Sequence, residues 1–100
     1  MKIPKKLKIA GFWYKITRSK QVSDHSSTFA STFNSQQEIN VGNDFPIQKQ
    51  EQTFLHEILH AIWFCYGLKE AGFKNDQEEH IVDALSNGLY QVLKDNKLIK

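Results

Sequence analysis

Residues 47–66, IQKQEQTFLHEILHAIWFCY, predict one long helix around which the rest of the chain folds. Pro46 is typical of a first helical turn and Gly67 of a helix end, so we expect the helix to span about residues 46–66. At about 100° per residue, a narrow polar strip runs along a helix that is largely apolar elsewhere. This strip consists of Thr53, His56, Glu57 and His60. A helix with such a pattern is expected to be buried.

The first part of the chain, about residues 6–42, predicts three or four short strands. Apolar and β-branched residues flank Ala10 and Gly11, which suits two strands joined by a tight turn. Phe29 and Phe33 alternate with Ser31, a pattern typical of a half-buried strand. The connections look too short for crossovers, so we expect the sheet to be antiparallel.

A second helix is predicted over about residues 76–95, with Asp76 as its cap. Four apolar residues share one face of this helix, and we expect that face to pack against the core. They are Ile81, Leu85, Leu89 and Val92. The expected fold class is therefore α+β, with a small antiparallel sheet followed by two helices in a single domain over residues 1–100.

The composition excludes several classes of protein. The formal net charge is +2 and 24% of the residues are charged, which is ordinary for a globular domain. We therefore expect no nucleic-acid partner, and we interpret the N-terminal lysines as a solvated sheet edge. One cysteine, Cys65, excludes an internal disulfide framework and suits a reducing compartment. No segment reaches the roughly 18 apolar residues of a membrane span, so we expect a cytoplasmic protein without a membrane partner.

The polar strip contains the pattern H-E-x-x-H, formed by His56, Glu57 and His60. Residues four apart lie one helical turn apart, so the two imidazoles can share a metal ion. The carboxylate beside the first histidine points about 100° around the helix, from where it can reach a metal-bound water. The alternative is that both histidines are core residues bonded to backbone groups and that Glu57 is solvated.

A catalytic zinc site needs a third protein ligand. The remaining candidates are His25, Glu78, Glu79 and His80. We favour Glu79, because it shares a polar strip with Asp83 one turn later, and Asp83 could orient a ligand histidine. Glu78 instead points among leucines. The alternative role for Glu79 is a capping box with Asp76, which is a routine way to begin a helix.

The sequence HEILH (56–60), followed after eighteen residues by Glu79 and then by Asp83, resembles the gluzincin metallopeptidases of the thermolysin-like clan. The chain length and the order of its elements look like small stand-alone members from phages and prophages. The resemblance implies one Zn²⁺ per chain, held by His56, His60 and Glu79. It also implies that Glu57 is the general base and that Asp83 supports a ligand.

The same resemblance implies that an edge strand pairs with the peptide substrate, for which Thr28–Phe33 is the best candidate. Larger gluzincins supply a His or Tyr to the oxyanion, and His25 is the one candidate here. Two functions follow as hypotheses. The first is a zinc-dependent endopeptidase in which Glu57 activates a zinc-bound water. The alternative is a catalytically silent zinc-binding or interaction protein that keeps the same scaffold.

Overall fold

A computed structural model describes residues 1–19 and 30–100. The predicted residues His25, Thr28 and Phe29 lie outside the described residues. The described elements are the strands β1 (Lys6–Ile9), β2 (Phe12–Ser19), β3 (Ala30–Phe33) and β4 (Glu38–Gly42), the helices α1 (Ile47–Cys65) and α2 (Asn75–Asp95), and the short 3₁₀ helices η1 (Asn34–Gln36) and η2 (Leu68–Ala71). The expected α+β class, with the sheet before the two helices, is confirmed.

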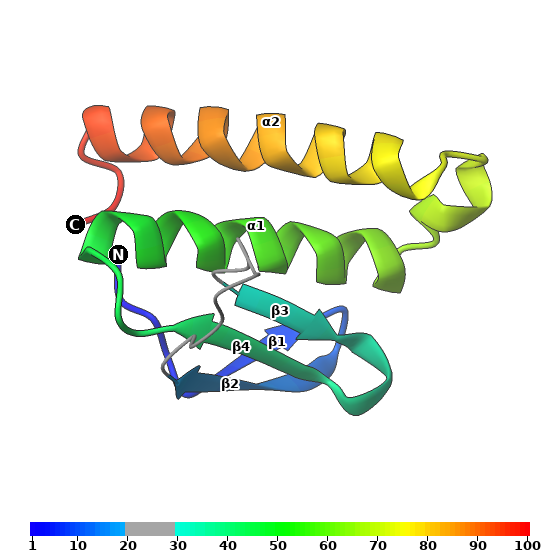
Figure 1. Ribbon diagram of the computed structural model, residues 1–100, viewed down its shortest axis with the longest axis horizontal. Helices are drawn as coiled ribbons and strands as arrows, with labels where there is room; N and C mark the ends of the chain where they lie inside the picture. The colour runs from blue at the N-terminus through cyan, green and yellow to red at the C-terminus, as the bar shows by residue number, and fades with distance from the viewer. Residues whose placement is uncertain (20–29) are drawn as a thin grey trace.

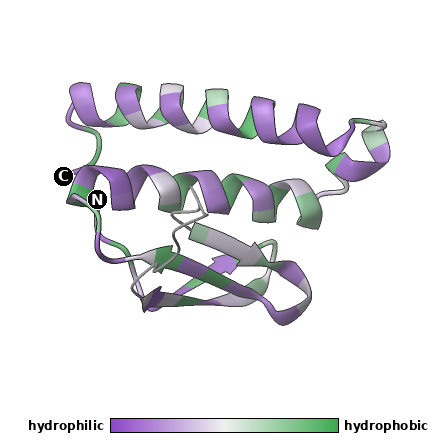
Figure 2. Cartoon of the chain, viewed as in Figure 1, coloured by the Kyte–Doolittle hydropathy of each residue, from purple (hydrophilic) through white to green (hydrophobic). Residues whose placement is uncertain are grey.

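The elements stack in three layers, with the sheet on one side, α1 in the middle and α2 outermost (Figure 1). The main core lies between the sheet and α1. Its buried residues are Ile9, Tyr14, Ile16, Ile39 and Val41 from the sheet and Phe54 and Ala61 from α1. This cluster, within the described residues, includes no member of α2, and α2 is mostly hydrophilic along its length (Figure 2).

The sheet order is β1-β2-β4-β3, which makes β3 an edge strand. The pairs β1–β2 and β3–β4 are antiparallel, as expected, and Ala10 and Gly11 both have the positive φ that a tight hairpin turn requires. The expectation of a purely antiparallel sheet is wrong, because β2 and β4 run parallel. Eighteen residues separate Ser19 from Glu38, and within them the chain forms β3 at the edge of the sheet before β4. The chain then reverses direction through η1, so β4 is antiparallel to β3 and parallel to β2.

The second helix returns along α1 after a turn through η2. Gly67 and Gly72, on either side of η2, both adopt the left-handed conformation that ends helical segments. Val82 and Ser86, each 1% exposed, are the residues of α2 most deeply buried. Neither helix, within the part of the chain that the structure describes, is long and apolar enough to cross a membrane.

The expected apolar core face of α2 is mostly exposed, which corrects that prediction. Leu85, Leu89 and Val92 are 59%, 41% and 46% exposed. The reason is the layering, because α1 covers the sheet and, among the described residues, α2 packs mainly against α1. Helical periodicity identified an apolar stripe correctly, but it could not show that no further layer would cover it.

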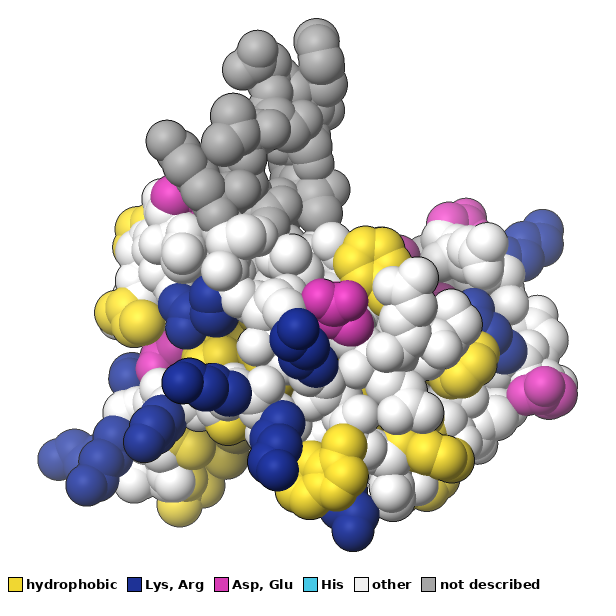
Figure 3. All heavy atoms as spheres, turned by 90° about the horizontal axis from the view of Figure 1, so that it is seen from below, with side chains coloured by type: hydrophobic (Ala, Val, Ile, Leu, Met, Phe, Trp, Pro, Cys, Tyr) yellow, Lys and Arg dark blue, Asp and Glu magenta, His cyan; other side chains and the backbone are white. Residues whose placement is uncertain are grey.

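The face of the sheet that points away from α1 carries basic side chains and an exposed aromatic ring. Strand alternation turns Tyr14 and Ile16 inward and leaves Trp13 and Lys15 outward. Figure 3, which views the molecule from the sheet side, shows Lys and Arg side chains spread over this face.

Candidate metal centre

Two imidazole rings from successive turns of α1 meet at one point. His56 and His60 are half-buried, and their Nε2 atoms lie 3.1 Å apart. Their ring centroids are 4.8 Å apart, with the rings tilted at 61°. The four-residue spacing produces this approach, because residues i and i+4 are stacked on the same helix face.

Glu79 reaches both rings from α2. Its Oε1 atom lies 2.8 Å from Nε2 of His56, and its Oε2 atom lies 2.8 Å from Nε2 of His60. The structure therefore brings Glu79, rather than its neighbour Glu78, to the Nε2 atoms of the histidine pair. Its side chain is 59% exposed, so it approaches the histidines from the solvent side of the centre.

Glu79 does not serve as a capping residue. The N-cap of α2 is Lys74, whose backbone N–H donates to the side chain of Gln77 at 2.8 Å, and Asp76 Oδ1 accepts from the N–H of Gln77. The predicted cap, Asp76, is therefore wrong by two residues, because α2 begins after Lys74, whose backbone N–H bonds to the side chain of Gln77. Both carboxylate oxygens of Glu79 face the histidines.

Hydrogen bonds alone account poorly for this arrangement. For Glu79 to accept a hydrogen bond from each ring, both Nε2 atoms must carry hydrogen, and two N–H groups would then converge across 3.1 Å. A divalent cation satisfies all the donor atoms at once. Tetrahedral zinc binds imidazole nitrogen at about 2.0–2.1 Å, which places two such nitrogens about 3.3 Å apart. The donor set of His56, His60 and Glu79 therefore fits a zinc ion.

The outer nitrogens of both rings face carboxylates, as is usual for histidines that bind metals. Nδ1 of His60 lies 2.7 Å from Oε2 of Glu78. Nδ1 of His56 lies 3.5 Å from Oδ1 of Asp83 and 3.5 Å from Oγ of Ser86. Such partners fix the tautomer and orientation of a ligand ring.

The sequence did not identify the role of Glu78. Its carboxylate is 12% exposed and lies between His60 and Lys69, whose Nζ is 3.3 Å from Oε1. Lys69 belongs to η2, so the contact depends on how the chain turns between the two helices. The sequence did place the Glu78 carboxylate on a face of the helix predicted to be buried. A buried carboxylate needs a compensating partner, and that requirement could have indicated its role.

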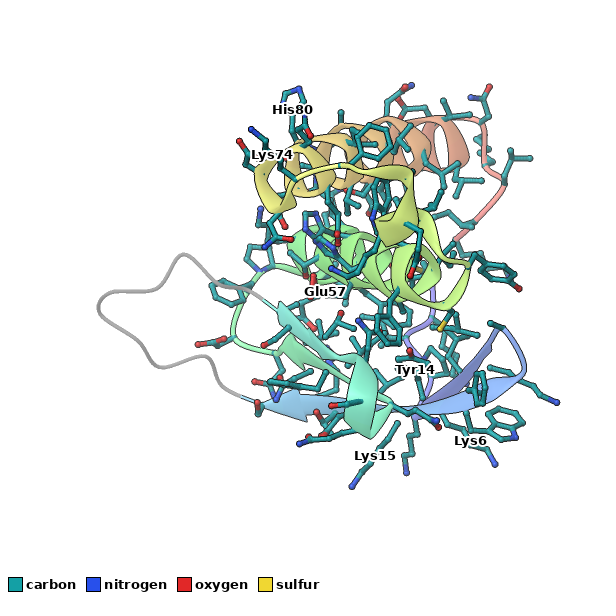
Figure 4. The ribbon with its side chains drawn as sticks, turned by 90° about the vertical axis from the view of Figure 1, so that its right-hand side faces the viewer. Lys6, Tyr14, Lys15, Glu57, Lys74 and His80 are labelled. Atoms are coloured by element: carbon teal, nitrogen blue, oxygen red, sulfur yellow. The ribbon has the colours of Figure 1, made fainter. Side chains whose placement is uncertain are left out.

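The side chain of Glu57 projects from α1 toward β3, as Figure 4 shows. It is 7% exposed, and its Oε1 accepts a hydrogen bond from Thr32 Oγ1 at 3.0 Å. Burial raises the pKa of the Glu57 carboxyl, while the hydrogen bond from Thr32 opposes that rise. Its Oε2 lies 3.9 Å from Nε2 of His56, and His56, Glu57 and His60 each offer one atom within 4.8 Å of the others. Glu57 thus belongs to the group of described side chains that could hold a metal ion, but its carboxylate lies farther from Nε2 of His56 than the carboxylate of Glu79 does.

A cleft of about 730 Å³ opens onto these groups. One wall is the edge strand β3, through Ala30, Ser31 and Thr32, and the other is formed by Glu79 and Asp83 of α2. Lys49 and Lys69 also line it. The described part of the predicted edge strand therefore borders the cleft.

Other candidates lie elsewhere. His80 is exposed on α2, where it borders a separate surface pocket with Phe73 (Figure 4). Tyr90 of α2 is not available as an oxyanion donor, because it donates a hydrogen bond of 2.6 Å to Glu51 and does not line the cleft. His25, the predicted oxyanion donor, lies outside the described residues.

Comparison with known proteins adds no assignment. No protein-family model, curated protein or solved structure matches the chain.

Proposed function

We propose that the protein is a zinc-dependent endopeptidase of the gluzincin type. The observation that carries this proposal is the convergence of His56, His60 and Glu79, with Glu57 held beside them at the floor of a cleft. A purely structural zinc site has no use for a second, buried carboxylate so close to the ligands. The proposal rests on this geometry together with the H-E-x-x-H pattern.

The bound zinc would lower the pKa of a water molecule and polarise the scissile carbonyl. Glu57 accepts the proton that the water loses as it attacks, and then delivers it to the leaving amine nitrogen. Thr32 keeps the carboxylate turned toward the cleft through its hydrogen bond to Oε1. Glu78 and Asp83 hold the ligand rings in place through the Nδ1 atoms.

A peptide substrate is proposed to lie along β3 as an additional strand. Within the described residues, β3 pairs only with β4, so its other edge has free backbone groups beside the cleft. We place the reaction in the cytoplasm, where the free Cys65 would stay reduced.

One observation favours the alternative of a catalytically silent zinc protein. The described residues that line the cleft include no tyrosine and no histidine besides His56 and His60. Without such a donor, the zinc alone would stabilise the oxyanion.

The experiment that decides between these functions measures zinc and hydrolysis separately. Elemental analysis of the tag-free protein is expected to give one zinc per chain, and His56→Ala is expected to lose it. Glu57→Gln is expected to keep the zinc and to hydrolyse a quenched-fluorescence peptide mixture roughly 10²–10⁴-fold more slowly than the wild type. Zinc binding without turnover in the wild type would support the silent alternative, and an absence of zinc would refute both.

A further inference from the structure

The structure collects basic and aromatic side chains on the side of the sheet that faces away from the candidate metal centre. We define the outer sheet face as Lys6, Lys8, Trp13 and Lys15. The antiparallel register places Lys6 opposite Lys15 and Lys8 opposite Trp13. All four side chains are exposed, whereas their strand neighbours Ile9 and Tyr14 are buried. Figure 4 shows Lys15 pointing away from α1.

The low net charge of the chain conceals a separation of charge. Residues 1–19 contain six Lys or Arg and no Asp or Glu. Helix α2 contains five Asp or Glu and one Lys. In the four described strands, Glu38 is the only acidic residue, and it lies beside Lys15 in the register. The sheet therefore presents a positive surface (Figure 3), and the negatively charged α2 lies on the opposite side of the molecule (Figure 1).

Protection of a sheet edge explains only part of this surface. Lysines on the edge strand β1 discourage pairing with other chains. Lys15, however, lies on β2, which is paired on both sides, and it faces Lys6 across the strands. Like charges in directly opposed positions are unfavourable to the sheet. Glu38, on the other side of Lys15, offsets part of that repulsion, and a ligand with negative charge would offset the rest.

Trp13 adds a stacking platform to the charges. Its side chain is 53% exposed, with Nζ of Lys6 at 4.6 Å and Nζ of Lys8 at 5.5 Å from the ring centroid. A positive surface with an exposed aromatic ring is how many proteins bind single-stranded nucleic acid, since bases stack on the ring while cations meet the phosphates. A membrane-binding surface combines basic side chains with several apolar ones, whereas the outer sheet face holds a single aromatic ring among three lysines.

We propose that the outer sheet face binds single-stranded nucleic acid, with a base stacked on Trp13 and phosphates held by Lys6, Lys8 and Lys15. The sequence alone did not favour such a partner, because it did not show that Trp13 and Lys15 join the N-terminal lysines on one surface. No residue of this face lines the cleft, so the binding is independent of the proposed hydrolysis.

The test is a fluorescence-anisotropy titration of a labelled oligothymidylate of about 15 nucleotides with the full-length chain. The logarithm of the binding constant is expected to fall with the logarithm of salt concentration with a slope of about −2, as for three phosphate contacts on a single strand. The double variant Lys6→Glu/Lys15→Glu is expected to bind at least roughly tenfold more weakly. The matched control is Lys97→Glu/Lys100→Glu, which changes the net charge equally at exposed positions after α2 and should bind like the wild type.

A second measurement addresses the stacking. Trp13→Ala is expected to weaken binding by roughly tenfold. In the wild type, the oligonucleotide should quench the fluorescence of Trp13 and leave that of Trp63, which is 6% exposed. Far-ultraviolet circular dichroism of each variant checks that it is folded.

Three results would overturn the proposal. One is that the two double variants weaken binding equally, which would show that net charge alone attracts the oligonucleotide. Another is an absence of oligonucleotide binding by the folded wild-type chain at low salt. The last is that the chain does not bind the oligonucleotide but binds phosphatidylserine vesicles in a way that depends on Trp13. That result would mean that the outer sheet face binds membranes.

Discussion

Replacing Glu79 by alanine tests the metal centre most directly, because the structure separates its effect on zinc from its effect on the fold. Its side chain is 59% exposed, so its contacts in the zinc-free protein contribute little to stability. We therefore expect zinc-free Glu79→Ala to melt within a few degrees of the zinc-free wild type. Zinc should behave differently, because both Nε2 atoms of the pair lie 2.8 Å from this carboxylate.

The magnitude follows from linkage. Free zinc at 100 times its dissociation constant stabilises a folded protein by about 2.7 kcal/mol. In a domain of this size, 1 kcal/mol shifts the melting temperature by about 4–8 °C, so zinc should raise that of the wild type by roughly 10–20 °C. Excess EDTA should remove the whole increase. At the same zinc concentration, Glu79→Ala should show almost no increase.

Glu78→Ala is the matched control, one residue away. Its carboxylate holds Nδ1 of His60 and is not placed to bind the ion. Loss of such a partner typically weakens metal binding by about 10–100-fold. The zinc-dependent rise should then fall to between roughly one sixth and one half of the wild-type value. Differential scanning fluorimetry with buffered zinc measures all three proteins, and a larger loss for Glu78→Ala than for Glu79→Ala would refute the ligand assignment.

Two other predictions concern the neighbours of the centre and the orientation of α2. Thr32→Val should leave the zinc content unchanged and lower kcat roughly tenfold with little change in KM, because Glu57 loses a hydrogen bond worth about 1.5–3 kcal/mol. Thr32→Ser should restore the rate, whereas a loss of zinc in Thr32→Val would show that Thr32 has a structural role instead. Val82→Ala should lower the free energy of unfolding by about 1–3 kcal/mol, whereas Leu85→Ala, at a position 59% exposed, should change it by less than about 0.5 kcal/mol. Urea denaturation measures both values. A larger loss of stability for Leu85→Ala would mean that the other face of α2 is buried.

Local patterns predicted those parts of the fold that depend on neighbouring residues. The turn at Ala10 and Gly11 followed from turn chemistry, and α1 followed from its periodicity and from Gly67 at its end. The parallel pairing of β2 with β4 depends on which side of the sheet β3 occupies, and no local pattern records that choice. Exposure of the leucines on α2 likewise depends on the number of layers.

The same distinction applies to the site. His56, Glu57 and His60 lie within one helix, so their spacing alone predicted that the two rings would meet. The approach of Glu79 could be proposed because helical phase separated it from Glu78. The contact of Thr32 with Glu57 crosses from the sheet to α1, and it could not be predicted before the position of β3 was known.

The burial of Glu57 offers a final test of whether its carboxylate has a catalytic role or a stabilising one. Glu57 is 7% exposed, and burying a carboxylate costs free energy that natural proteins tolerate where function requires it. If its purpose is catalysis, Glu57→Leu should raise the free energy of unfolding of the zinc-free protein by roughly 1 kcal/mol while hydrolysis is lost. Thr32 would keep an acceptor, since its Oγ1 also lies 3.3 Å from the backbone oxygen of residue 57. Urea denaturation in EDTA measures the change. A destabilised Glu57→Leu would mean that the carboxylate holds β3 against α1, and the catalytic argument from its burial would fail.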